Sequence, residues 1–204
     1  MKTKGTDLAA TDRDRAKAQR REDLLAEATR LFAIHGYAGV SLEDLGAACG
    51  ISGPAVYRHF SGKPAVLIAL LVGVSEDMLE GGRKVTAAGG SAEEILKRLI
   101  AFHTDFALAR PDIIQVQDRH LVTLPAAELQ LVRKLQRAYI ALWTDQLHQI
   151  HPEETNAVIR FRAHAAFGLL NSTAHSAHSP RTSKAGLRKL LNQMAASALF
   201  TRVG

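Results

Sequence analysis

The sequence predicts an all-α protein made of a small amino-terminal unit and a larger carboxy-terminal domain. Apolar residues recur at helical spacing along most of the chain, and no stretch alternates apolar and polar residues as a half-buried strand does. Ser-x-x-acid capping signatures at Ser41 and Ser91 mark two helix starts, one in each part. The chain's 204 residues are enough for one large or two small domains.

The amino-terminal unit begins after a polar segment, residues 1–13, that lacks periodicity and that we expect to be a mobile tail. The basic bias of this end leaves two interpretations open, a solvated tail or an arm that touches a polyanion. From residue 14 to 35 an apolar stripe that includes Leu24 and Phe32 predicts a helix, and Gly36 ends it.

Two short helices joined by a glycine turn follow, and they predict a helix-turn-helix. Ser41 caps the first helix with Asp44 as its capping-box partner, and Gly50 stops it. Ser52 caps the second, with Pro54 in the first turn, where a missing N–H costs little. The unit therefore spans residues 14–63, and its last helix presents Ala55, Tyr57, Arg58 and His59.

A connector helix is predicted for residues 64–80, opened by Pro64. The four glycines between Gly81 and Ser91 indicate a loop. The second domain, residues 81–204, then reads as helices throughout. The expected helices, with a break near Pro180, cover residues 91–110, 112–122, 126–150, 153–172 and 183–200.

Composition sets bounds on the class of protein. Hydrophobic residues make up 47% and charged residues 23% of the chain, an ordinary globular balance. The net charge of +6 suits a polyanionic partner but is weak support alone. Cys49 is the only cysteine, which excludes an internal disulfide, and we interpret it as a core thiol. With a charged amino terminus and no apolar run long enough for a bilayer, we expect a cytoplasmic protein with no membrane partner.

The helix-turn-helix residues carry a family resemblance. They resemble the amino-terminal signature of the TetR/AcrR family of transcriptional regulators at Gly36, Tyr37, Val40, Ser41, Leu45, Ala48, Gly50, Ile51, Ser52, Val56, Tyr57, His59, Phe60 and Lys63. The common family form has threonine at Val40 and often lysine-glycine at Gly53–Pro54. Residues 101–125, 135–143 and 163–177 resemble a carboxy-terminal domain common in actinobacterial members. The alternative is a helical corner in an unrelated protein.

The resemblance implies that the second short helix enters the major groove of DNA. The residues expected to contact DNA are Ser41, Ser52, Gly53, Pro54, Ala55, Tyr57, Arg58, His59 and Lys63. Arg58 can read guanine or grip phosphate, or be merely solvated, and Tyr57 and Lys63 are expected on phosphates.

An effector cavity is expected in the second domain. The candidate lining residues are Phe102, His103, Phe106, Gln117, His120, Tyr139, Trp143, His164, Phe167 and Asn171. Two interpretations of the three histidines stay open, ligand contacts or satisfied core groups, and for the others the alternative is a filled core. We expect an apolar effector such as a fatty acyl compound.

No catalytic, cofactor or metal motif stands out. The sequence lacks a G-x-S-x-G, an H-E-x-x-H and a phosphate-binding glycine loop. The pairs His148/His151 and His175/His178 have a spacing that could clip a metal, but we interpret them as surface or capping histidines. We therefore expect no enzyme activity, no cofactor and no metal.

The combined expectation is a dimeric, ligand-responsive repressor that binds a palindromic double-stranded operator and leaves it when the effector binds. By resemblance the last two helices form the homodimer interface, and the expected residues there or in the core beneath are Leu169, Leu187, Leu190, Leu191 and Met194. The connector helix is the expected lever of the switch. Two alternatives are an architectural protein that coats DNA without sequence preference and a helical metalloenzyme.

Overall fold

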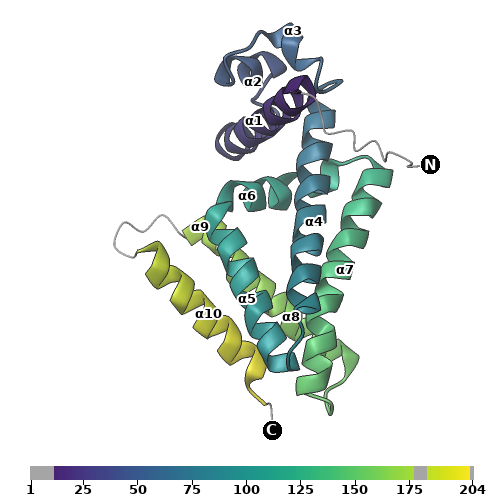
Figure 1. Cartoon of the computed structure of the whole chain (residues 1–204), viewed down its shortest axis with the longest axis vertical. Helices are drawn as coiled ribbons and strands as arrows, with labels where there is room; N and C mark the ends of the chain where they lie inside the picture. Colours follow the sequence, from purple (N-terminus) through teal and green to yellow (C-terminus); the bar gives the residue numbers. More distant parts are fainter. Residues whose placement is uncertain (1–11, 177–182, 203–204) are drawn as a thin grey trace, which may run out of the picture. The chain divides into compact units, whose positions relative to one another are not determined.

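The protein is described here from a computed structural model that covers residues 12–176 and 183–202 (Figure 1). Within these residues the structure contains helices and their connections and no strand, so the prediction of an all-α fold is confirmed. The contacts divide the chain into two compact units, residues 1–66 and 67–204. The expected tail lies mostly outside the described residues, although helix α1 (Asp12–His35) already begins two residues before the predicted start.

The first unit contains α1, α2 (Leu42–Ala48) and α3 (Gly53–Val56). Its core is formed by apolar side chains that are at most 5% exposed: Leu24, Ala28, Phe32, Val40, Leu42, Leu45, Val56 and Phe60. The capping box at the start of α2 is present. The Ser41 hydroxyl accepts from the Asp44 N–H at 3.0 Å, and the Ser41 N–H donates to an Asp44 carboxylate oxygen at 2.8 Å.

Gly46 lets α2 and α3 approach closely. A Cβ at this position would lie 2.9 Å from the Ile51 carbonyl oxygen and 3.2 Å from a Val56 methyl group. Gly50, with φ of 65°, provides the left-handed residue that ends α2 and turns the chain. The tight angle of the helix-turn-helix therefore depends on these two glycines.

The regular part of α3 is shorter than the sequence predicts. After Val56 the chain continues in tighter turns, in which the Arg58 N–H donates to the Ala55 carbonyl and the His59 N–H to the Val56 carbonyl. Ser52 occupies the N-cap position but makes no side-chain capping bond, contrary to expectation. Pro54 has no N–H to offer, and the Ala55 N–H already donates to the Ser52 carbonyl at 2.8 Å.

Helix α4 (Lys63–Ala87) is longer than predicted, because the expected loop at residue 81 is helical up to Ala87. A Cβ at Gly81 would overlap the Phe102 ring, and one at Gly82 would lie 2.7 Å from the Tyr139 ring. These two glycines therefore allow neighbouring helices to pack against α4. The helix ends before Gly89 and Gly90, both of which have positive φ.

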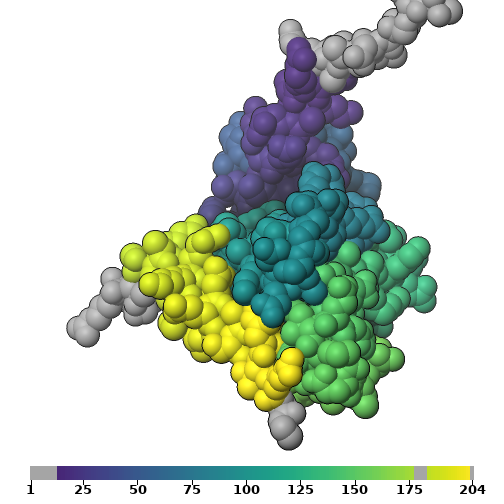
Figure 2. All heavy atoms as spheres, turned by 60° about the horizontal axis from the view of Figure 1, so that its bottom comes forward, coloured from purple at the N-terminus to yellow at the C-terminus, as the bar shows by residue number. Residues whose placement is uncertain are grey.

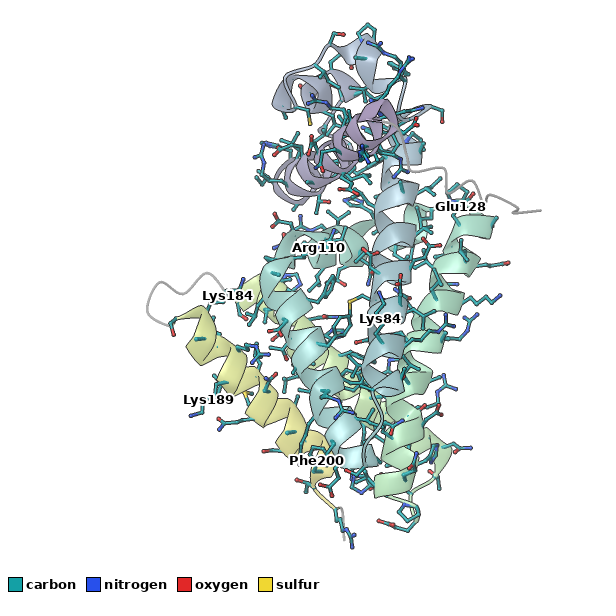
Figure 3. The ribbon with its side chains drawn as sticks, viewed as in Figure 1. Lys84, Arg110, Glu128, Lys184, Lys189 and Phe200 are labelled. Atoms are coloured by element: carbon teal, nitrogen blue, oxygen red, sulfur yellow. The ribbon has the colours of Figure 1, made fainter. Side chains whose placement is uncertain are left out.

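The second unit contains the remaining helices: α5 (Ala92–Ala109), α6 (Pro111–His120), the short 3-10 helix η1 (Leu121–Thr123), α7 (Ala126–Ile150), α8 (Asn156–Asn171), α9 (Thr173–Ser176) and α10 (Lys184–Phe200). Helix α5 packs against α7, α8 and α10, and α8 packs against α7 and α10. Figure 2 shows the yellow atoms of α10 forming one edge of this unit. Arg110, labelled in Figure 3, lies between α5 and α6.

The core of the second unit is apolar and well buried. Its largest fully buried side chains include Trp143, Leu96, Ile100, Ile159 and Leu170. Burial of each such side chain stabilises the fold by about 1.5–3 kcal/mol. Within the described residues no helix combines the length and apolar character that a membrane span needs.

The last carbonyl groups of α10 are bonded by side chains of α8 and of the connection before it. His151 is fully buried, and its Nε2 donates to the Leu199 carbonyl at 2.7 Å. Arg162 donates to the Ala198 carbonyl at 3.0 Å and pairs with Glu154. Carbonyls at a helix end have no partner within the helix, so these contacts satisfy them. His151 belongs to one of the two histidine pairs whose spacing could bind a metal, and its Nε2 is used in this hydrogen bond. His178, of the other pair, lies outside the described residues.

Candidate nucleic-acid interface and ligand cavity

The surface around α3 combines exposed polar groups with two buried anchors. Val56 and Phe60 are in the core of the first unit, whereas Tyr57 is 55% exposed and Arg58 is also exposed. Ser52 and Pro54 are exposed, and the remaining candidates at Gly53, Ala55 and His59 are partly exposed. Since the anchors fix the turn, the intervening side chains project outwards from it.

Helix α1 adds positive charge beside this turn. Arg13, Lys17 and Arg20 line the same shallow surface hollow as Arg58 and His59. Burial lowers the pKa of His59, and the nearby cations Lys17, Arg58, Arg20 and Arg21 lower it further. The basic residues near the amino terminus were visible in the sequence, but no local signal placed them next to α3.

The Lys63 ammonium group, at the start of α4, is bonded to the backbone of the first unit. It donates to the carbonyls of Tyr37 and Val40 at 2.8 Å each and to that of Ala38 at 3.4 Å, and it lies over the Tyr37 ring. An ammonium has three N–H donors, so all of them are directed at the protein. The Ser41 hydroxyl also donates within its capping box, to Asp44 at 2.7 Å.

A cavity of about 230 Å³ lies in the second unit, and side chains of α4, α5, α6, α7 and α8 line it. It is lined by Val74, Ser75, Met78, His103, Phe106, Ile113, Ile114, Gln117, Gln136, Tyr139, Ile140, His164, Phe167 and Asn171. Seven of these are among the ten side chains that the sequence predicts: His103, Phe106, Gln117, Tyr139, His164, Phe167 and Asn171. The structure therefore brings most of the predicted residues together.

Three predicted lining residues lie elsewhere. Phe102 faces Gly81 of α4 instead of the cavity. Trp143 is fully buried behind the cavity lining. The centre of its ring is 4.8 Å from that of Phe167 and 6.0 Å from that of His103. His120 is at the end of α6 and partly exposed. Phe102 and Trp143 therefore support the cavity walls or the helix packing.

His103 is the centre of a hydrogen-bond network on the cavity wall. Its Nε2 is 3.0 Å from Oδ1 of Asn171, and its Nδ1 is 3.2 Å from the Tyr139 hydroxyl. One neutral tautomer satisfies both contacts, because Nε2–H donates to the Asn171 oxygen and Nδ1 accepts from Tyr139. Burial lowers the pKa of His103 to about 4, although the Asn171 contact opposes this, so the imidazole is neutral at pH 7.

Tyr139 is also held neutral at this site. Burial raises the pKa of its phenol, and the nearby Trp143 indole N–H lowers it by less. The geometry between the indole and the phenol falls short of a full hydrogen bond, so the indole N–H has no hydrogen-bond partner within the part of the chain that the structure describes. The cavity wall therefore offers neutral polar groups within an aromatic surface.

The chain thus has a helix-turn-helix with a basic surface in its first unit and a cavity in its all-α second unit. These two features define the class of the protein, a two-unit helix-turn-helix protein with a cavity. Residues 24–70 match the family model of bacterial regulatory proteins, tetR family. The repressor KstR2 of Rhodococcus jostii is 29% identical over 109 residues, which cover 52% of this chain and 53% of that protein. The chain spans about half the length of this curated relative. In its amino-terminal unit the chain is therefore similar to TetR-family regulators.

Solved structures share the fold. A TetR-family regulator from Bordetella parapertussis superposes with a TM-score of 0.77 at 24% identity, covering 86% of this chain and 93% of that one. AibR, solved with isovaleryl coenzyme A and operator DNA, gives a TM-score of 0.73 at 17% identity, covering 89% and 98%. At these identities the likeness establishes the fold alone.

Proposed function

We propose that this chain is a transcriptional repressor that binds operator DNA through its first unit and releases it when a small apolar effector occupies the cavity. The observation that carries the proposal is the presence, in one chain, of an outward-facing helix-turn-helix and a separate aromatic cavity. KstR2 is named a transcriptional repressor, and AibR was solved with an acyl coenzyme A and operator DNA, which supports the same pairing here.

The proposed DNA contacts are Ser52, Tyr57, Arg58 and His59, joined by Lys17 and Arg20 of α1. Arg58 has an exposed guanidinium that can pair with guanine O6 and N7, while α1 supplies charge for phosphates. Lys63 and Ser41 support the turn instead, since their donors are bonded within the protein.

Selection of binding sites from random DNA duplexes tests this function. We expect a near-palindromic site with half-sites about 34–36 Å apart, or a multiple of that spacing. Arg58→Ala should weaken binding by about 1–3 kcal/mol and relax one base position. Recovery of unrelated sequences would favour the architectural alternative instead.

Dimer formation is proposed through α8 and α10, which pack side by side. Large apolar side chains are exposed on both helices: Val158 (41%), Phe161 (74%), Leu190 (49%) and Met194 (46%). Lys184 and Lys189, labelled in Figure 3, are exposed on α10 and suit a polar rim. Leu191 is only 8% exposed, so it belongs to the core of the subunit rather than to the proposed interface.

The switch is proposed to act through α4. Val74, Ser75 and Met78 bring this helix into the cavity wall, and the same helix begins at Lys63, beside the helix-turn-helix in sequence. A ligand shifts two states only by its differential affinity for them, and a coupling of about 1–3 kcal/mol lowers operator affinity roughly 5–150-fold. Operator DNA must then weaken ligand binding by the same factor, which calorimetry on free and operator-bound protein measures.

A further inference from the structure

Among the described residues, no Lys, Arg, Asp or Glu side chain lines the cavity. His103, a buried residue of the lining, uses both ring nitrogens within the protein and is neutral at pH 7. His164 is exposed and lies where the lining meets the outer surface of α8. A charged group that entered the cavity would therefore lose its water without gaining a counter-charge, and such burial is strongly unfavourable.

Three side-chain carboxamides converge on the cavity from three helices: Gln117 from α6, Gln136 from α7 and Asn171 from α8. Asn171 uses its oxygen to accept from His103, while its amino group has no partner among the described residues. The Gln117 and Gln136 side chains make no hydrogen bond with any described residue. A carboxamide offers two N–H donors and one acceptor oxygen. The cavity wall therefore has uncharged hydrogen-bond donors and acceptors that the protein itself does not use.

The size of the cavity limits what these groups can bind. An apolar cavity of about 150 Å³ holds one benzene molecule, which corresponds to about 25 Å³ for each non-hydrogen atom. By that measure, 230 Å³ holds about nine non-hydrogen atoms. The rings of Phe106, Tyr139 and Phe167 supply the apolar surface for such a group. A long acyl chain does not fit without expansion of the cavity.

We propose that the cavity takes an uncharged group of about nine non-hydrogen atoms that carries a neutral carbonyl, such as a carboxamide or ketone, and that it excludes carboxylates and ammonium groups. The carboxamides of Gln117, Gln136 and Asn171 bind the carbonyl, and the aromatic rings pack on the rest. This ligand class rests on the proposed function, in which the cavity is the effector site.

Three probes of nearly equal size and different charge test the ligand class: octanamide, octanoate and octylamine. Each is titrated by calorimetry into the full-length protein at pH 7.5. We expect octanamide to bind, octanoate to bind at least about 100-fold more weakly because it must first take up a proton, and octylamine not to bind. Between pH 7.5 and 6 the octanoate affinity should rise about tenfold per pH unit, whereas that of octanamide should not change. Equal or tighter binding of a charged probe, or no octanamide binding at millimolar concentration, overturns the proposal.

Substitution on α7 locates the binding. Gln136→Leu should weaken octanamide about 3–10-fold through loss of one hydrogen bond, while Gln130→Leu, an exposed glutamine on the same helix, should leave it unchanged. Equal effects of the two substitutions would place octanamide outside the cavity and refute the assignment. Urea unfolding of both variants checks that they are folded.

Release of DNA is measured separately, so that the two proposals can fail independently. If octanamide binds with the expected selectivity but does not change operator affinity, the ligand class stands and the effector role of the cavity fails. If a charged compound binds at Gln136 and releases the operator, the effector role stands and the ligand class fails.

Discussion

Replacement of Lys63 by methionine separates a structural role from a DNA contact at this position. The ammonium group makes two hydrogen bonds of 2.8 Å to backbone carbonyls and a weaker one of 3.4 Å, and it lies 4.6 Å from the centre of the Tyr37 ring. Hydrogen bonds from charged donors contribute about 1.5–3 kcal/mol each. Lys63 is half-buried, so solvent reduces this sum, and we expect a loss of about 2 kcal/mol.

Hydrogen exchange measures this loss locally. Two kcal/mol of local stability corresponds to about 30-fold faster exchange, which we expect for amides of residues 37–48 in Lys63→Met. The control is Lys17→Met, because Lys17 is exposed on α1. It should leave exchange unchanged and lower the slope of log affinity against log salt by about 0.9 if it binds one phosphate.

The opposite pattern would refute the reasoning. If Lys63→Met exchanges like the unmodified protein and also lowers the salt slope by about one unit, Lys63 is a phosphate contact. The hydrogen bonds to the three carbonyls would then contribute nothing measurable to the turn.

Three further outcomes are expected. Burial lowers the pKa of His103 from 6.5 to about 4, so the unfolded state binds the proton more readily, and the free energy of unfolding should fall by up to about 3 kcal/mol as the pH drops from 6.5 towards 4. Urea unfolding should show this loss in the unmodified protein and not in His103→Gln. The same pH profile in both proteins would contradict the prediction. Gly82→Ala should destabilise the second unit by about 1–3 kcal/mol through overpacking, whereas Gly73→Ala, where a Cβ meets nothing within 4 Å, should be neutral or stabilising. If Gly73→Ala unfolds at a lower temperature than Gly82→Ala, the close approach at Gly82 is excluded. Phe161→Asp should give monomers in sedimentation, and Val122→Asp, equally exposed on η1, should not; a dimer in both would move the interface away from α8.

Much of the helix pattern could be predicted because its signals are local. The capping boxes at Ser41 and Ser91 and the turn at Gly50 act within about four residues. They mark helix starts and stops wherever the chain later folds. Helix α7 begins and ends at the predicted residues for the same reason, since Pro125 precedes it and Pro152 follows its end.

The cavity was predicted in part. Aromatic and histidine residues on α5, α7 and α8 indicated a site, and His103, Tyr139 and Asn171 meet there. The contribution of α4 was missed, because Val74 and Met78 are ordinary apolar residues of a buried helix face. Phe102 was misplaced because sequence spacing does not specify which of two neighbours an apolar side chain packs against.

The sequence by itself determined where helices begin and end, which faces are apolar and which family the chain resembles. Tertiary structure alone decided that Gly81 and Gly82 admit neighbouring rings instead of ending α4, and that Lys63 bonds the carbonyls of residues 37–40 instead of standing free. It also decided that Arg20 and Lys17 lie beside Arg58. The reason is physical: the role of a glycine or an ammonium group depends on which atoms are nearby, and here those atoms come from residues some 20 to 60 positions away in the chain.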